Sequence, residues 1–220
     1  MQPPAEPAPA PERNIYLDGV EVANPVVVTG RARTFESNVA LRVRDARGKL
    51  IGETFTTATG EIGTHSPFRG TIWVTRDPGA SITVDALEYS ARDGSEQSLV
   101  SMTRPFDVEL VEATLYLPNA DCTGVVAQKR RIPKSISMAR LLVEALMAEP
   151  APFPKESRVE SINLRDGTLT VDFNGRLQNV GGSCAAQMIR QSVTRTLMEL
   201  PSVKKVVITA AGSEALALQP

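Results

Sequence analysis

The spacing of apolar residues changes near residue 110, and this change constrains the fold more than any other feature of the chain. In residues 13–110, short runs alternate apolar with polar residues, and turn residues separate these runs roughly every ten positions. The run with Val39, Leu41 and Val43 is one example, and the turn DARGK (45–49) follows it. Such alternation is typical of strands that bury one face, so this half is predicted to form an all-β sandwich.

Two further turn sequences lie in this half. DPGA (77–80) is expected to connect a strand ending near Val74 to a strand containing Ile82, so that the two form a hairpin. ARDGS (91–95) is expected to lead to a closing strand at 106–110. No segment of this half has convincing helical spacing.

Residues 111–220 have a different pattern. Strands are expected around Leu115 and at 125–132, and the apolar residues from Met138 to Leu146 then recur at helical spacing after Ser135 or Ser137, either of which can cap a helix. The remaining expected elements are a hairpin around RDGT (165–168), an amphipathic helix from Ala185 to Leu200 ended by Pro201, and a strand at 203–209. This order predicts a small α+β domain with two helices on one face of a sheet.

The composition excludes several classes of protein. The chain has 220 residues, a net charge of -1 and only 5% aromatic residues, so nothing indicates general attraction to nucleic acid. A single histidine leaves few general bases and few metal ligands, so an enzyme is not the favoured interpretation.

The N-terminus points to a tether. No run approaches the roughly 18 to 20 apolar residues of a membrane helix. Residues 1–12 (MQPPAEPAPAPE) cannot bury a core and are expected to be a disordered, extended spacer. Because such tracts often tether a domain to a surface, we expect that an export signal or lipid anchor originally preceded this spacer.

The residues of both halves resemble known families. NPVVVTGRARTFESNVALRVRDARGKLIGETFTTA and the later SPFRGTIWV resemble the immunoglobulin-like domain of bacterial spore germination. ATLYLPN (113–119), ARLLVEALM, LTVDFN and TLMELPSVKKVVI resemble the GerMN domain, also called the sporulation and spore germination domain. Near the end, AAG (210–212) departs from this pattern, in which a strand usually runs into Asp-Gly. The resemblance implies an immunoglobulin-like β-sandwich followed by a GerMN-like α+β domain.

The resemblance also implies a function. Proteins of this kind are non-enzymatic cell-envelope proteins, often lipoproteins, and GerMN domains are similar to ring-building modules of secretion and sporulation complexes. No catalytic residue, cofactor or metal carries over. We therefore expect an extracytoplasmic protein, secreted or tethered as a lipoprotein, whose partners are envelope proteins or further copies of itself.

Cys122 and Cys184 allow more than one interpretation. Both lie beside turn sequences, and two cysteines in an exported domain favour a disulfide. In the loop-entropy model, closing a loop of about 60 residues contributes on the order of 4 kcal/mol. Alternatively, Cys184 after Gly181 and Gly182 is a thiolate nucleophile at a helix N-terminus, with the distant His65 as its base, or both thiols are free. No spacing favours zinc.

Other candidate residues point to binding. The basic cluster, defined as Lys129, Arg130, Arg131 and Lys134, is either a solvated strand edge or a site for a cell-wall polymer, lipid headgroups or an acidic partner. Trp73 is either part of the sandwich core or a sugar-stacking surface. Asp172 in VDFN is expected to bond a following loop rather than to act as a general acid. The polar face of the second helix is the expected self-association surface, formed by Arg190, Gln191, Arg195 and Glu199.

The sequence favours a structural, protein-binding module of the cell envelope. The alternative from a different class is a module that binds peptidoglycan or another wall glycan. An enzyme based on Cys184 is the third class. No cofactor, metal or nucleic acid is expected, and the membrane is expected to be reached only through the removed anchor.

Overall fold

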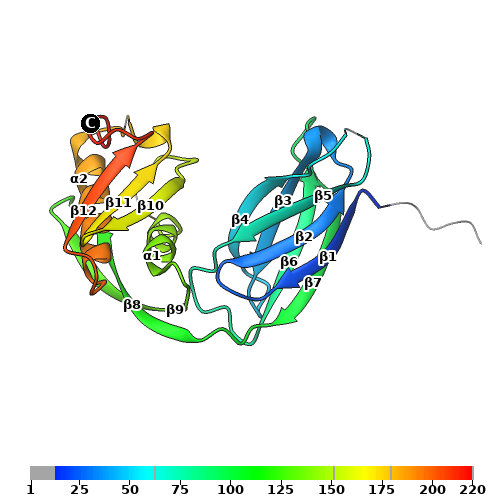
Figure 1. Cartoon of the computed structure of the whole chain (residues 1–220), viewed down its shortest axis with the longest axis horizontal. Coiled ribbons are helices and arrows are strands. Elements are labelled where there is room, and N and C mark those ends of the chain that lie inside the picture. Colours follow the sequence, from blue (N-terminus) through cyan, green and yellow to red (C-terminus); the bar gives the residue numbers. More distant parts are fainter. Residues whose placement is uncertain (1–12, 62, 151, 179, 220) are drawn as a thin grey trace, which may run out of the picture. The chain divides into compact units, whose positions relative to one another are not determined.

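The computed structural model describes residues 13–61, 63–150, 152–178 and 180–219, so the expected spacer at 1–12 lies outside the described residues (Figure 1). The chain divides into two compact units. The first contains the described residues up to Val22, then Val26–Ile72 and Ala80–Pro105. The second contains Ala23–Pro25, Trp73–Gly79 and the chain from Phe106 onward. The expected boundary after residue 110 falls at the first residue of a strand, β8.

The first unit is a β-sandwich with two antiparallel sheets, in the orders β1-β2-β5 and β4-β3-β6-β7. Alternating residues of β2 and β3 are buried, such as Val26 and Val28 on β2 and Leu41 and Val43 on β3, and they form the interior between the sheets. The strands are β1 (Ile15–Glu21), β2 (Val26–Ala32), β3 (Asn38–Arg44), β4 (Leu50–Thr57), β5 (Ser66–Ile72), β6 (Ser81–Tyr89) and β7 (Glu96–Pro105).

The hairpin expected around DARGK is confirmed, because β3 pairs antiparallel with β4 across it. The hairpin expected across DPGA is wrong. β5 pairs with β2, whereas β6 pairs with β3 and β7 in the other sheet, so residues 73–80 cross between the sheets. The closing strand is also earlier than expected. It is β7, which ends at Pro105, while 106–109 have no regular structure.

The second unit combines a long hairpin, a second sheet and two helices. β8 (Leu110–Pro118) pairs antiparallel with β9 (Val125–Pro133). β10 (Val159–Arg165) returns through a two-residue Asp-Gly turn as β11 (Thr168–Phe173), which confirms the expected hairpin. β12 (Lys205–Ala210) runs parallel to β11, as expected after a helical crossover.

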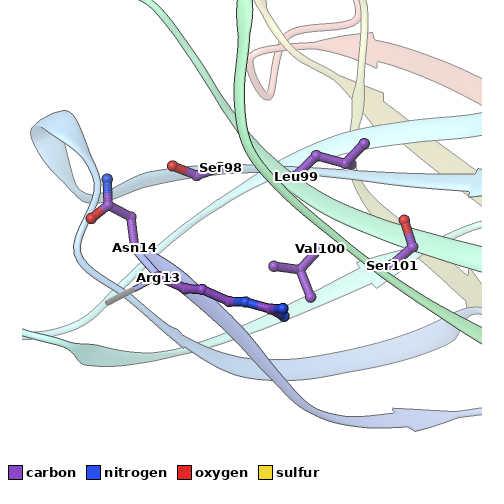
Figure 2. Close-up of a pocket in the computed structure, with 6 residues that line it drawn as sticks. All are labelled: Arg13, Asn14, Ser98, Leu99, Val100 and Ser101. Atoms are coloured by element: carbon purple, nitrogen blue, oxygen red, sulfur yellow. The ribbon is translucent and has the colours of Figure 1, made fainter. Parts of the chain in front are cut away.

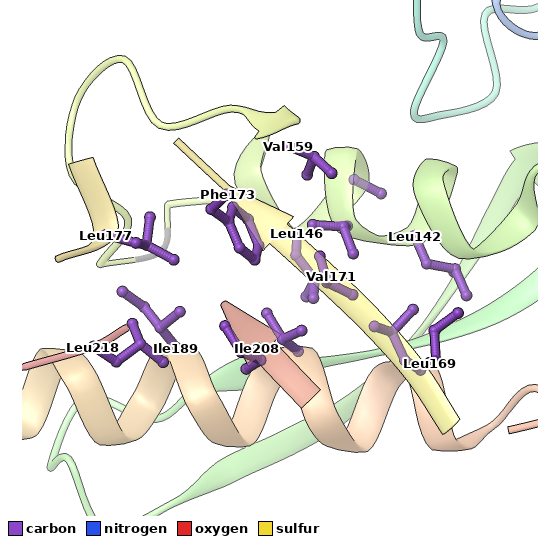
Figure 3. Close-up of a cluster of buried hydrophobic side chains, with 14 of the residues drawn as sticks. Leu142, Leu146, Val159, Leu169, Val171, Phe173, Leu177, Ile189, Ile208 and Leu218 are labelled. Atoms are coloured by element: carbon purple, nitrogen blue, oxygen red, sulfur yellow. The ribbon is translucent and has the colours of Figure 1, made fainter. Parts of the chain in front are cut away.

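Both expected helices are present, as α1 (Met138–Met147) and α2 (Ser183–Met198). The two helices contact each other, α1 lies next to β10, and α2 lies next to β12. On β11, Leu169, Val171 and Phe173 are buried, whereas the alternating residues are only half-buried. The sheet is therefore covered on one face, as the sequence predicts, and its buried residues form the core with the helices (Figure 3).

A buried asparagine joins three segments of the second unit. Asn24 is only 5% exposed, and its side-chain Nδ2 donates to the carbonyl oxygens of Val74 (3.1 Å) and Pro133 (3.0 Å). Its Oδ1 accepts a hydrogen bond from the Val74 backbone N–H at 3.1 Å. The Ser135 hydroxyl donates to the Asn24 carbonyl oxygen at 2.6 Å. The loops 23–25 and 73–79 are thus fixed to the segment between β9 and α1.

The N-terminus of α1 differs in detail from the expected cap. Ser137 occupies the cap position, but its side chain makes no capping hydrogen bond. The Ser135 hydroxyl instead accepts the backbone N–H of Ser137 at 3.1 Å. The helix ends at Met147, shortly before Pro150.

Candidate interaction surfaces

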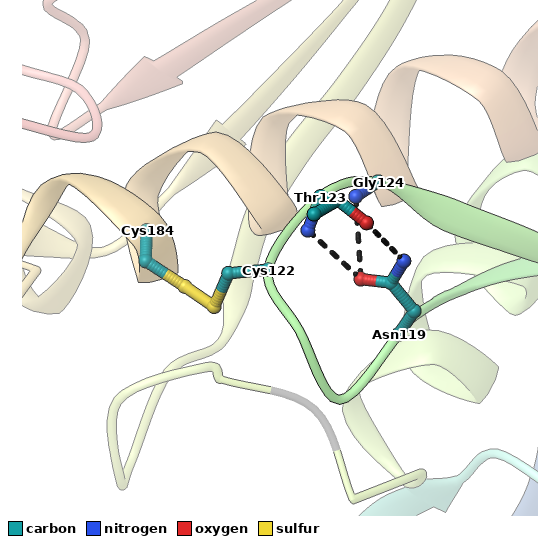
Figure 4. Close-up of a disulfide and its surroundings, with 5 residues drawn as sticks. All are labelled: Asn119, Cys122, Thr123, Gly124 and Cys184. Atoms are coloured by element: carbon teal, nitrogen blue, oxygen red, sulfur yellow. Dashed lines mark hydrogen bonds between the residues drawn. A yellow bond between two sulfur atoms is a disulfide. The ribbon is translucent and has the colours of Figure 1, made fainter.

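Cys122 and Cys184 form a disulfide, with their Cα atoms 5.9 Å apart (Figure 4). Cys122 lies in the turn between β8 and β9, and Cys184 lies in the first turn of α2. The Asn119 side chain holds this turn, because its Oδ1 accepts the backbone N–H groups of Thr123 (3.0 Å) and Gly124 (3.2 Å). The disulfide therefore fixes the end of the β8–β9 hairpin to the start of α2.

The disulfide decides between the interpretations of the two cysteines. Neither sulfur is a thiolate in this bonded state, so Cys184 is not a nucleophile and the two thiols are not free. The Nε2 of His65 lies 2.9 Å from the carbonyl oxygen of Arg13, and its ring packs edge-on against Tyr16 with centroids 5.3 Å apart. His65 thus belongs to a local contact within the first unit.

The basic cluster is paired with acidic side chains of the same unit. Lys129 Nζ lies 2.7 Å from a Glu112 carboxylate oxygen, and Lys134 Nζ lies 2.7 Å from Glu109. The other two pairs are longer, at 3.8 Å for Arg130 with Glu149 and 3.7 Å for Arg131 with Asp77. Each cation has an anionic neighbour, which lowers the positive potential that an anionic wall polymer or lipid surface would need.

The polar face of α2 is largely engaged within the second unit. The Arg195 guanidinium lies over the Tyr116 ring, 5.9 Å from its centroid, and the Tyr116 hydroxyl donates to Glu199 at 2.8 Å. This hydrogen bond raises the pKa of Tyr116. Arg190 Nη2 lies 3.4 Å from the Ala217 carbonyl oxygen, and Gln191 is half-buried. These contacts anchor α2 to β8 and to the C-terminal segment.

Trp73 lies in neither of its expected places. The ring is half-buried and packs against the hydrophobic core of the second unit, rather than inside the sandwich or free in solvent. It belongs to the loop 73–79, which the Asn24 hydrogen bonds hold in place. A stacking platform for sugars needs an open aromatic face, which this packing does not favour.

Asp172 has the expected structural role. Its Oδ1 accepts hydrogen bonds from the Thr209 hydroxyl (2.6 Å) and from the Gly212 backbone N–H (2.9 Å). The carboxylate therefore joins β11 to the end of β12 and to the turn after it. This turn contains the AAG sequence that departs from the family pattern.

Few other groups in the described part of the chain have the character of a reactive site. Burial raises the pKa of Glu144 on α1 above its ordinary value, although Arg140 lies 2.8 Å away and opposes the shift. Among the described residues, no group of three or more His, Cys, Asp or Glu side chains is arranged to hold a metal ion. No helix in that same part is long and apolar enough to cross a membrane.

A polar depression of about 400 Å³ lies where the described chain begins (Figure 2). Arg13 and Asn14 line one part of it, and Ser98, Leu99 and Ser101 of β7 line another. The Ser101 hydroxyl already donates a hydrogen bond to Asp85 Oδ1 at 2.6 Å. The depression has no pair of residues that could act as nucleophile and base.

The sandwich carries a surface that the sequence did not reveal, which we name the acidic aromatic surface. It consists of Phe35, Glu36, Phe55, Glu88 and Tyr89, which line a depression of about 390 Å³. Phe35 and Phe55 are each 63% exposed. The alternation of β4 gives no sequence signal for this surface, because Phe55 comes four residues after the buried Ile51 and regular alternation would place both on one face. A register shift of β4 at Ile51 separates the two. The proximity of Phe35 and Tyr89 requires the fold.

Comparisons with known proteins agree with the two-unit fold. Residues 17–95 match the family described as the immunoglobulin-like domain of bacterial spore germination, and residues 114–216 match the family described as sporulation and spore germination. No curated protein matches the chain.

Three solved structures are similar to part of the chain. The first GerMN domain of the sporulation protein GerM from Bacillus subtilis is 31% identical, with 47% of this chain and 84% of that chain covered and a TM-score of 0.40. The tandem GerMN domains of the same protein are 30% identical, with 47% and 40% covered and a TM-score of 0.40. A putative lipoprotein from Clostridium perfringens is 15% identical, with 47% and 76% covered and a TM-score of 0.32.

Proposed function

We infer from its two families that this chain is a non-enzymatic, extracytoplasmic protein of the cell envelope that works by binding other proteins. Residues 17–95 belong to the family of immunoglobulin-like domains of bacterial spore germination, and residues 114–216 belong to the sporulation and spore germination family. The observation that carries the proposal is the Cys122–Cys184 disulfide. Disulfides persist in oxidising compartments outside the cytoplasm, and this one removes both thiols from chemistry.

A crosslinking experiment tests this function. A membrane-impermeant, amine-reactive crosslinker is applied to intact cells that make the protein, and its crosslinked products are identified by mass spectrometry. The proposal expects crosslinks to other envelope proteins or between copies of the chain. Protein that reacts only after lysis would refute the extracytoplasmic location, and protein that is modified in intact cells but never crosslinked would refute the binding role.

We extend the proposal to self-association through the edge of the second sheet. β10 pairs with β11 on one side only within the described part of the chain, and edge strands can pair with another chain. Leu164 on β10 is 49% exposed. Glu160 and Arg165 place charges toward the two ends of the strand, and Ser161 to Leu164 lie between them.

Light scattering across a concentration series measures this self-association. The mass of the unmodified protein is expected to increase with concentration, and Leu164→Lys is expected to reduce this increase. Leu99→Lys is the matched control, because Leu99 is a leucine of β7 with a similar exposure of 52%. Association through β10 would be contradicted if the mass stays at that of a monomer at all concentrations, or if both variants reduce its increase with concentration equally.

Binding of a cell-wall glycan has no specific support as a second function. That alternative uses the sandwich loops together with Trp73, and the Trp73 ring packs against the core of the second unit. Cosedimentation of the protein with purified sacculi would nevertheless be direct evidence for it.

A further inference from the structure

The acidic aromatic surface lies on the outer face of one sheet of the sandwich. On β3, Leu41 faces the other sheet, where its side chain approaches Gly70 of β5, so the adjacent Ala40 faces outward. Phe55 of β4 is the cross-strand partner of Ala40 and shares this outer face. Its ring lies 6.2 Å from the ring of Tyr89 on β6, measured between centroids. Phe35 belongs to the short turn before β3 and lines the same depression.

The exposed rings of Phe35 and Phe55 are unusual for a surface without a binding role. Each of the two phenylalanine residues is 63% exposed, and both border one depression instead of being scattered. Single exposed apolar residues are ordinary, but grouped aromatic residues are characteristic of binding surfaces. Neither ring has a polar atom, so the rings favour a ligand with apolar or cationic groups.

The surroundings of the rings are negatively charged. Arg42 lies between Glu53 (3.0 Å) and Glu96 (2.6 Å), so one guanidinium serves two carboxylates. Hydrogen bonds to Glu96 and Glu53 raise the pKa of Arg42, which keeps it charged. Arg44, the next cation on the same face, forms an ion pair with Asp85, with Nη2 and Oδ1 2.6 Å apart.

Two further carboxylates, those of Glu36 and Glu88, line the same depression. Glu36 is exposed, and Glu88 accepts the backbone N–H of Phe35 at 2.6 Å. No ion pair of Glu36 or Glu88 is present among the described residues. Among the described residues, Arg42 is the one cation that forms an ion pair with any of these four carboxylates, and the resulting excess of negative charge disfavours anionic polymers and phosphate headgroups.

We propose that the acidic aromatic surface binds a basic segment of a partner protein, in which lysine or arginine side chains lie next to apolar ones. The stems of lysine and arginine can cover the Phe35 and Phe55 rings while their charged ends reach Glu36 and Glu88. Charge complementarity and cation–π attraction act together at such a contact. The inference rests on the proposed protein-binding function, which it deepens by naming the chemistry of a partner.

Fluorescence anisotropy with labelled peptides tests this proposal. The probe is a peptide that alternates lysine with phenylalanine, and the comparison is the same peptide with glutamate in place of lysine. The lysine peptide is expected to bind, more weakly as salt increases, and the glutamate peptide is not. Phe55→Thr is expected to weaken binding about tenfold, and Glu36→Gln about threefold.

Matched variants control for nonspecific effects. Leu99→Thr removes an exposed apolar side chain elsewhere on the sandwich, and Glu61→Gln removes an exposed carboxylate, so neither should change the affinity. Circular dichroism melts check that Phe55→Thr is folded. Failure of the lysine peptide to bind, equal binding of both peptides, or binding that Phe55→Thr leaves unchanged would overturn the proposal.

Cosedimentation with sacculi separates a glycan ligand from a basic peptide at this surface. If sacculi cosediment with the protein in a manner that depends on Phe55 while the lysine peptide does not bind, the surface recognises a glycan and the proposal is refuted. Self-association and crosslinking are measured without the peptide, so this inference can fail while the proposed envelope function stands.

Discussion

Asn24 shows how a single buried side chain stabilises the second unit. Its amide satisfies the N–H and carbonyl of Val74 and the carbonyl of Pro133, all in a place closed to water. A buried backbone N–H or carbonyl group that loses its hydrogen-bond partner lowers the stability of the fold, because water cannot replace that partner. The sequence offered no sign of this role, since an asparagine before a proline is also common in exposed turns.

We expect Asn24→Ala to reduce the free energy of unfolding by about 3 kcal/mol, because it leaves several buried backbone groups without hydrogen bonds. Urea unfolding followed by circular dichroism measures this loss. Asn163→Ala is the control, because Asn163 is exposed on β10. The role assigned to Asn24 would be wrong if the two variants were equally stable.

Glu144 predicts a specific dependence of stability on pH. Burial raises its pKa in the folded state above the ordinary value of 4.5, so the folded protein binds this proton more tightly than the unfolded chain does. The contribution of Glu144 to stability therefore falls as pH rises from its ordinary pKa through the raised folded pKa, and is constant above that.

Glu144→Gln is expected to remove this decrease, because glutamine does not titrate. The measurement is urea unfolding of both proteins at several values between about pH 4 and pH 7. Glu160→Gln serves as the control, since Glu160 is an exposed residue of β10. An unchanged pH dependence in Glu144→Gln would show that this carboxyl does not titrate abnormally.

At the scale of elements, the disulfide and the turn held by Asn119 both stabilise the contact between the β8–β9 hairpin and α2. They fix the β8–β9 hairpin to α2, where the Tyr116 backbone N–H also donates to the buried Thr196 hydroxyl at 3.0 Å. Loss of the disulfide frees a loop with a sequence separation of 62 residues between its ends. The entropy of the unfolded chain then rises, and the folded unit becomes less stable.

We expect Cys122→Ser and Cys184→Ser to lower the stability by a similar amount, on the order of 4 kcal/mol, because either change opens the same loop. Thermal unfolding of both variants, compared with the reduced unmodified protein, measures the loss. Two variants with clearly different melting temperatures would indicate that one cysteine has a role besides the disulfide.

The elements with regular periodicity were predictable from the sequence. The apolar spacing of α1 and α2 and the Asp-Gly turn between β10 and β11 each have a local physical cause, so their positions follow from short windows. The pairing of β5 and β6 was not predictable in this way. A turn sequence shows that the chain bends, but not whether the next strand stays in the same sheet.

The candidate surfaces were less predictable, because they depend on contacts between distant residues. The run of Lys129, Arg130 and Arg131 looks free in sequence, yet its partners include Glu112, Glu149 and Asp77. Trp73 likewise alternates as a strand residue would, but it packs with a core formed mostly after residue 110. The acidic aromatic surface combines three separate segments, and only folding brings them together.

At the scale of the whole molecule, the surfaces of both units fit the protein-binding function that we propose. The sandwich provides the acidic aromatic surface, and the second unit provides an open sheet edge and a disulfide. Its two cysteines are joined to each other, so neither sulfur is available as a nucleophile. We propose that these cysteines are structural and that the protein acts outside the cytoplasm through its surfaces.

The most direct test is the intact mass of protein that has been made under oxidising conditions and alkylated under denaturing conditions, before and after reduction. We expect that no alkyl group is added before reduction and that two are added after it, because Cys122 and Cys184 are bonded. Two groups added without reduction would contradict the structural role of these cysteines, and the reactivity of Cys184 at the start of α2 would then be the next property to test.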